Sequence, residues 1–166
     1  MRYLLMSLTT CVLVFTYNAR AQSEVDLSHL KNEKSDELFV EFHEDTQCGW
    51  NLEPIVDSEL EKAGINRKRS WDFDELVLYV NIYCIENENS AGELLGYVYD
   101  MNIAFGHFVR FESHAEGVFV RMHMEPGDYS TFGVVTNDEA GRQKMRDSLR
   151  EIKGKALADY WKANGK

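Results

Sequence analysis

A run of apolar residues near the middle of the chain constrains the fold more than any other feature. Residues 74–85 (DELVLYVNIYCI) place apolar side chains on both faces of an extended strand. A strand that buries both faces is typical of a central position in a sheet. One face carries Leu76, Leu78, Val80, Ile82 and Cys84, and the other carries Val77, Tyr79, Tyr83 and Ile85.

A shorter strand and a helix precede this central strand. Alternation across residues 38–43 (LFVEFH) predicts the strand, and Pro54 suits the first turn of the helix. Gly64 should end the helix in the left-handed conformation, with Ile65 folded back onto Leu60 in a Schellman motif. The strand–helix–strand order predicts a parallel crossover if the two strands are neighbours.

The chain contains three cysteines, Cys11, Cys48 and Cys84. Cys11 lies in an amino-terminal segment that we expect to be removed, and the remaining even pair in an exported protein predicts a Cys48–Cys84 disulfide. Both cysteines lie near the carboxyl ends of the expected parallel strands, so the bond and the topology support each other. The competing interpretation is a nucleophilic Cys48 in the segment TQCGW, which has no second catalytic motif beside it.

Residues 1–21 (MRYLLMSLTTCVLVFTYNARA) have the pattern of an export signal. Arg2 precedes a short apolar run, and Ala19-Arg20-Ala21 is a small-x-small cleavage site, so the mature chain should begin at Gln22. The run is shorter than the roughly 20 apolar residues needed to span a bilayer. We therefore expect a periplasmic or secreted protein without membrane insertion after cleavage. The alternative, a lipoprotein box at residues 8–11, is disfavoured by the bulk of Thr10.

The net charge excludes some classes of partner. The chain has a formal charge of −10 at pH 7, and loss of Arg2 and Arg20 with the signal would make it more acidic. Such a field repels phosphate backbones and anionic lipid headgroups, so we expect no nucleic-acid partner. We expect the basic cluster at residues 67–69 to lie in a solvated turn.

The second half of the chain predicts further strands and a long final helix. Thr136 and Glu139 fit a capping box, and the helix that they start should run to about Ala163. Gly106 should mark a bulge in the first of these strands. The expected segments before the helix are strands at 97–111, 118–124 and 129–135, a hairpin loop at 113–117 and a turn at 126–128.

Together these elements predict an α+β fold within a single domain at residues 37–166. We expect a two-layer sandwich with a mixed, mostly antiparallel sheet of four to five strands and two helices on one face. The order is strand, helix, three or four strands, helix. Residues 1–21 are the expected signal, and residues 22–36 should form a flexible lead-in.

This order resembles small envelope domains of Gram-negative bacteria, such as the amino-terminal domain of the translocation protein TolB and the lipopolysaccharide-assembly lipoprotein LptE. The matching features are the strand–helix entry at 38–64, the antiparallel run at 74–135 and the helix end DYWKAN at 159–164. The resemblance implies a non-catalytic adaptor between envelope components. The lipobox of the lipoprotein members is absent from this chain.

Few residues offer chemistry, and we expect neither a cofactor nor a metal site. The weak metal candidates are His43, Asp45 and His123. In a strand, His123 points away from Met122 and Met124, so these three side chains cannot share an ion. His43 and Asp45 leave the first strand at its carboxyl edge, where a small secreted hydrolase could also place its site. No catalytic motif is present, and we assign no catalytic residue.

Aromatic side chains form the expected binding surface. Tyr79, Tyr83 and Phe119 lie on strands, and helices on one face of the sheet would leave such rings on the other. Two outcomes are open: the rings form an exposed partner surface, or curled strands and the lead-in bury them. We expect an exported, non-enzymatic binding or adaptor protein of the cell envelope with a protein partner. The alternatives are a small secreted hydrolase and a metal-binding carrier.

Overall fold

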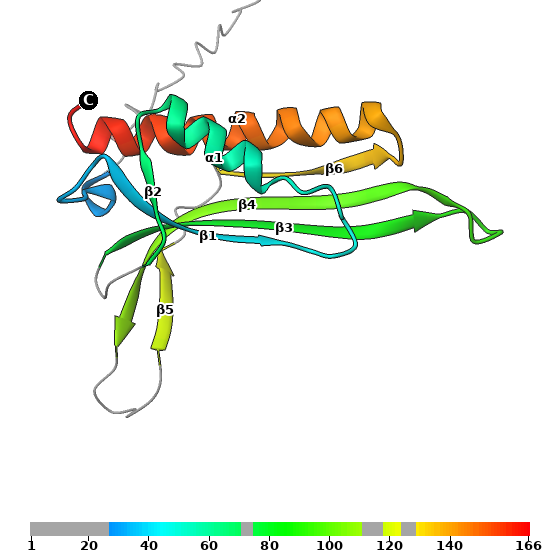
Figure 1. The fold of residues 1–166 in the computed structure, drawn as a ribbon. Coiled ribbons are helices and arrows are strands. Elements are labelled where there is room, and N and C mark those ends of the chain that lie inside the picture. The colour runs from blue at the N-terminus through cyan, green and yellow to red at the C-terminus, as the bar shows by residue number, and fades with distance from the viewer. Residues whose placement is uncertain (1–26, 71–74, 111–117, 124–128) are drawn as a thin grey trace, which may run out of the picture.

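The computed structural model describes residues 27–70, 75–110, 118–123 and 129–166, with the backbone alone at 108–110 and 118–123. Two helices pack on one face of an open, mixed β-sheet, which confirms the predicted α+β class (Figure 1). The elements are η1 (Ser28–Leu30), β1 (Glu37–Glu44), α1 (Glu53–Lys62), β2 (Asn66–Lys68), β3 (Leu76–Glu88), β4 (Leu94–Arg110), β5 (Val118–His123), β6 (Ser130–Thr136) and α2 (Glu139–Ala163).

The sheet has six strands in the order β2-β1-β3-β4-β5, and β6 also pairs with β4. β1 runs parallel to β2 and β3, whereas β3, β4, β5 and β6 pair in antiparallel fashion. β5 and β6 share one side of β4, because β5 pairs with residues 105–110 and β6 pairs with residues 96–102. Any cross-section of the sheet therefore contains no more than five strands.

The parallel crossover from β1 through α1 to β3 has the predicted geometry. A disulfide joins Cys48 and Cys84, whose Cα atoms are 5.3 Å apart. Gly64 has a φ of 71°, and the Ile65 amide donates to the Leu60 carbonyl at 2.9 Å. The predicted Schellman motif is thus confirmed, and it ends α1 so that the chain can enter β2.

The core lies between the sheet and the two helices. Even-numbered residues of β1 and β3 and odd-numbered residues of β4 point toward α1 and α2. The apolar stripe predicted for α2 is buried against them. The most deeply buried members are Leu38, Leu52, Val56, Leu60, Leu78, Val80, Ile82, Met101, Met145, Leu149, Ala156 and Tyr160. This shared apolar layer is the main source of stability.

Three local predictions are wrong. Arg67 and Lys68 lie in the edge strand β2 and not in a turn, because Arg67 pairs with Glu53 and Asp57 at 2.7 Å and donates to a β1 carbonyl. β4 is continuous through Gly106, which pairs with β3 on one side and β5 on the other. The register of the β3–β4 pairing shifts instead at 87–88, next to the β3–β4 turn.

The third correction concerns the start of α2. Thr136 does not cap the helix; the cap is Asp138, whose carboxylate accepts the Gly141 amide at 2.8 Å. The Thr136 hydroxyl instead donates to Asp138 at 2.7 Å and orients that carboxylate. These bonds lower the pKa of Asp138, the Gly141 amide contributing most. A carboxylate accepts such a bond more strongly than a hydroxyl, which explains the exchange of roles.

The described part of the predicted lead-in, residues 27–36, is anchored to the end of α2. Leu30 is buried, and Asn164 donates to its carbonyl at 3.0 Å. The Asn32 side chain donates to the Tyr160 hydroxyl at 3.1 Å, and its backbone amide donates to the Asn164 side-chain oxygen at 2.9 Å. This part of the segment is therefore packed onto the fold.

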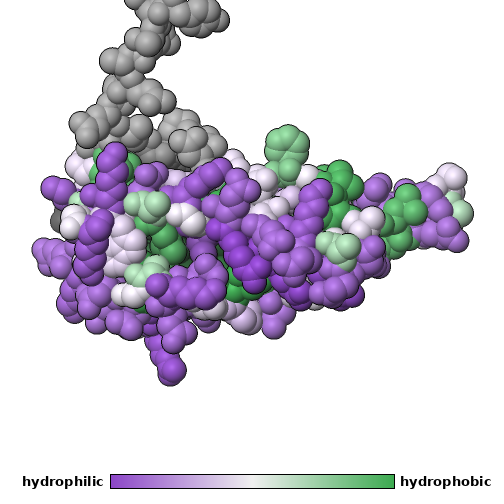
Figure 2. Space-filling view, turned by 90° about the horizontal axis from the view of Figure 1, so that it is seen from above, coloured by the Kyte–Doolittle hydropathy of each residue, from purple (hydrophilic) through white to green (hydrophobic). Residues whose placement is uncertain are grey.

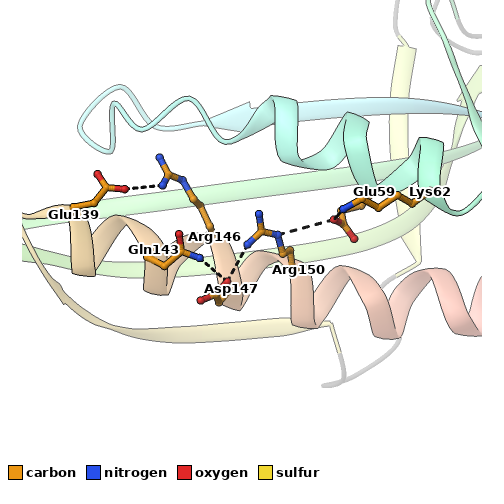
Figure 3. Close-up of polar contacts among 7 residues, drawn as sticks. All are labelled: Glu59, Lys62, Glu139, Gln143, Arg146, Asp147 and Arg150. Atoms are coloured by element: carbon orange, nitrogen blue, oxygen red, sulfur yellow. Dashed lines mark hydrogen bonds and ion pairs between the residues drawn. The ribbon is translucent and has the colours of Figure 1, made fainter.

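Ion pairs link α1 and α2 at the surface of the helical layer (Figure 3). Arg150 donates to Asp147 at 2.9 Å and lies 4.0 Å from Glu59 of α1, which pairs with Lys62. Beneath them, Lys153 is completely buried and donates to the Ile55 carbonyl at 3.4 Å. Burial lowers the pKa of Lys153 to about 8, although the nearby Glu59 carboxylate opposes this shift.

Candidate functional site

The face of the sheet opposite the helices is the candidate functional site, and we call it the open face. Tyr99 defines the covered side, since its hydroxyl lies 3.1 Å from the Ser148 hydroxyl of α2. Residues 98, 100 and 102 of β4 must then point to the open side, because successive strand residues alternate. The strand pairings extend this face to β3 and β6.

Five exposed apolar side chains gather on the open face. In one row across the sheet, Ile85 lies opposite Val98, which lies opposite Val134; in the next row, Asp100 lies between Tyr83 and Phe132. Phe132 is 83% exposed and Ile85 is 67% exposed. We call this set the open-face patch: Tyr83, Ile85, Val98, Phe132 and Val134 around Asp100.

The two ends of the open face differ in exposure. Toward β5, Val77 and Ala104 are buried even though they point away from the helices. Toward the β3–β4 turn, Tyr83, Ile85 and Val98 are exposed. The expected two-faced burial of β3 therefore holds for only part of the strand, because the second face is uncovered at its carboxyl end.

The tip of the β3–β4 hairpin projects beyond the helices (Figure 1), and the patch lies on the strands next to this tip. Seen from the helix side, most of the surface is hydrophilic, with scattered apolar residues, some of them toward this projecting end (Figure 2). Leu95, which precedes the patch on β4, is also half exposed. The uncovered apolar surface thus belongs to one end of the molecule.

The predicted binding residues are only partly brought together. Tyr83 lies in the open-face patch, and the His43 ring lies 5.9 Å from its ring. Tyr79 lies further along the same face and is half-buried; its burial, with Tyr83 and Glu41 nearby, raises the pKa of its hydroxyl. The side chain of Phe119 lies outside the described residues. Sequence reasoning missed Phe132 and Val134, whose i, i+2 spacing on β6 was the available signal.

A half-buried polar side chain, Asn81, lies between Tyr79 and Tyr83 on the open face of β3. The Asn81 side-chain oxygen is shielded from solvent and accepts no hydrogen bond from any residue that the structure describes. Asn81 pairs in register with His43 of β1 and Asn102 of β4, next to the row that holds Tyr83. The open face therefore combines an apolar end with a short polar row.

The residues at the carboxyl edge of β1 organise a loop. Both carboxylate oxygens of Glu44 accept backbone amides, from Trp50 at 2.8 Å and Leu52 at 2.7 Å. The Asp45 carboxylate accepts the Gln47 amide at 3.1 Å. Within the described ranges, no three His, Cys, Asp or Glu side chains gather closely enough to hold a metal ion. The His123 side chain is not described.

A cavity of about 310 Å³ lies at the other end of β1, away from the open-face patch. Its lining alternates in charge: Lys34 lies 3.6 Å from Glu37, and Lys68 pairs with Glu75. His107 also contributes to the wall. Opposite charges that neutralise each other give this cavity no strong preference for a charged ligand.

Similar solved structures were found for the fold. A minor lipoprotein from Acinetobacter baumannii is 15% identical over 75% of this chain and 91% of that chain, with a TM-score of 0.35. The rare lipoprotein B from Shewanella oneidensis is 11% identical over 76% of this chain and 92% of that chain, with a TM-score of 0.31. The chain resembles small Gram-negative envelope domains, as expected, and similarity at this level says nothing about function.

No protein-family model matches the chain, and no curated protein is significantly similar to it. No helix in the described ranges has both the length and the apolar character needed to cross a membrane. The function must therefore be argued from the surface of the chain itself.

Proposed function

We propose that this chain is an exported, non-enzymatic binding or adaptor protein of the cell envelope, and that a protein partner docks on the open-face patch. One observation carries the proposal: apolar side chains from three strands meet on one uncovered face of the sheet. Soluble monomers seldom leave contiguous apolar surface exposed unless another molecule covers it. Aromatic residues such as Phe132 and Tyr83 are also enriched at protein interfaces relative to the rest of a protein surface.

The covalent structure supports export. Cys48 and Cys84 are joined, and disulfides persist in oxidising compartments such as a periplasm or the outside of the cell. The amino-terminal signal, at residues 1–21, lies outside the described residues. Export by that signal and a periplasmic or secreted location are parts of the proposal.

The surroundings of the patch favour a protein over a membrane surface. Glu86, Glu88 and Glu93 lie on the hairpin beside it, and the chain carries a net charge of −10. Anionic headgroups would be repelled by this hairpin. A protein can match both the apolar residues and the acidic border.

The two alternative functions, a secreted hydrolase and a metal carrier, are not supported by the residues that would form their sites. A hydrolase at the edge of β1 would require His43 or Asp45 to face a substrate-sized cleft with a nucleophile. Instead, His43 lies against Tyr83 and Asp45 closes a turn. A metal carrier would need a cluster of ligands that the described residues do not form.

The test is co-purification of envelope proteins with the tagged, exported chain. Proteins that bind the wild type should be lost with Tyr83→Ser and Phe132→Ser, and should remain with Ala158→Ser, which alters an exposed residue on α2. Retention of the same proteins by all variants would contradict the proposed surface. Turnover of a peptide, ester, glycan or phosphate substrate by the purified chain would contradict the non-enzymatic function.

A further inference from the structure

We propose that the partner presents a Lys or Arg side chain flanked by apolar residues, and that this cation pairs with Asp100. The inference rests on the proposed function, because it names the chemistry of the partner at the same surface. Its basis is the position of a single carboxylate within an apolar row.

Any partner that covers the open-face patch must also cover Asp100. It pairs in register with Tyr83 on one side and with Phe132 on the other, and Val98 and Asn102 flank it on the same face of β4. Adjacent strands lie about 4.8 Å apart, so a partner that contacts both rings must pass over the carboxylate. Docking on Tyr83 and Phe132 therefore removes water from Asp100.

The carboxylate of Asp100 has no partner within the described part of the chain to replace that water. It is exposed, and neither a hydrogen bond nor an ion pair joins it to another described residue. A carboxylate that becomes buried without a counter-charge is strongly destabilising, whereas a hydrogen-bonded cation compensates for the lost hydration. The partner must supply this cation.

The neighbouring rings also favour a cation. Tyr83 and Phe132 flank the carboxylate, and an ammonium or guanidinium group above it would approach the ring faces. Arg and Lys both carry apolar stems that can pack on Val98 while the charged group reaches Asp100. The row thus matches a cation and its flanking apolar residues at once.

A second copy of this chain is a poor match for the same surface. Among the strand residues whose side chains are described, Lys68 is the only Lys or Arg that points to the open face, and it pairs with Glu75. Lys144 reaches the border of the face from α2, where it donates to the Val134 carbonyl at 3.2 Å. Two copies, each with a net charge of −10, would place acidic faces together.

The experiment uses photo-crosslinking of the full chain in cells that export it. The photoreactive amino acid benzoylphenylalanine replaces Ser130, an exposed residue on the same face of β6 as Phe132. Adduct yield is compared for the unchanged chain, Asp100→Asn, Asp100→Lys and Phe132→Ser. Glu61→Gln, at an exposed acid on α1, is the matched control for loss of a carboxylate.

We expect Asp100→Asn to lower the adduct yield at least about tenfold, Asp100→Lys to abolish it, and Glu61→Gln to leave it unchanged. Mass spectrometry should place a Lys or Arg of the partner in the cross-linked segment. Changing that residue to Glu should abolish the adduct, and Asp100→Lys should then restore it. Disulfide retention and circular dichroism show that each variant has folded.

The contrary outcomes are distinct. If Phe132→Ser removes the adduct and Asp100→Asn does not, the cation is refuted while the proposed function stands. If neither change alters the yield, or no adduct forms, the proposed function fails as well. An adduct with lipid or with a second copy of the chain also overturns the inference.

Discussion

The two faces of this sheet are built from the same strands and have opposite characters. On β3, Ile82 points to the helices and is fully buried, whereas Ile85 points to the open face and is 67% exposed. β4 shows the same contrast between buried Met101 and exposed Val98. Apolar composition alone therefore does not mark the core, because the placement of α1 and α2 decides which apolar residues contribute to folding. The remaining residues are available for binding.

The largest expected contrast comes from two isoleucines on one strand. Ile82→Ala should lower the free energy of unfolding by about 3–4 kcal/mol, because it leaves a cavity in a packed layer. Ile85→Ala should lower it by less than about 1 kcal/mol, since that side chain stays largely in water. Denaturant unfolding followed by circular dichroism measures both. Equal losses would show that the open face is covered in solution.

The disulfide belongs to the covered side and should contribute to stability alone. Replacing Cys48 and Cys84 together by Ala should lower the free energy of unfolding by about 2–4 kcal/mol, because the unfolded chain regains the freedom of the loop. Co-purification of envelope proteins should continue at temperatures where the variant stays folded. Loss of binding by a fully folded variant would tie the disulfide directly to the docking surface.

Lys153 places a charge inside the covered layer and should make stability depend on pH. Its pKa is lowered from 10.5 to about 8 in the folded state, so the folded chain releases this proton at lower pH than the unfolded chain does. The free energy of unfolding should therefore rise by up to about 3 kcal/mol between pH 8 and 10.5. Below pH 8 both states carry the proton, and the destabilising effect of burial is complete.

Lys153→Met removes this dependence and gives the comparison. The variant should be about 1–3 kcal/mol more stable than the wild type at pH 7, because a buried charge is replaced by an apolar chain of similar length. Lys155→Met, at an exposed position two residues on, should keep the wild-type slope. If Lys153→Met unfolds with the same pH slope as the wild type, Lys153 is not desolvated in solution.

The smallest effect on stability is expected at Phe132. Phe132→Ser should change the free energy of unfolding by less than about 0.5 kcal/mol, because the ring is 83% exposed. The same change should reduce the fluorescence of a neutral, polarity-sensitive dye that binds apolar surface, and Ala158→Ser should not. Undiminished dye fluorescence would place the accessible apolar surface elsewhere.

Local chemistry explains which parts of the fold could be predicted from the sequence. The end of α1 at Gly64 and the buried stripe of α2 depend on residues close together in the chain, and both were predicted correctly. The parallel pairing of β1 with β3 was supported by an independent constraint, the Cys48–Cys84 pair. Agreement between such signals is what makes a prediction from one sequence possible.

The misses arise from contacts between distant or competing residues. Arg67 pairs with Glu53 and Asp57 of α1, and these ion pairs stabilise the basic segment as strand β2. From the sequence alone, a basic tripeptide indicates a solvated turn. At the start of α2, Thr136 and Asp138 both suit a cap, and the two carboxylate bonds decide between them. The open-face patch depends on β6 pairing with β4, which the alternation of either strand cannot show.

The anchoring of residues 27–36 to the end of α2 has a consequence for how the domain can be held. The short helix η1, the first described element of the chain, lies at one pole of the molecule, and the β3–β4 hairpin projects from the other (Figure 1). A tether attached ahead of Leu27 would leave the hairpin directed away from its point of attachment. The same molecule could then be fastened at one pole while it reaches another component with the opposite one.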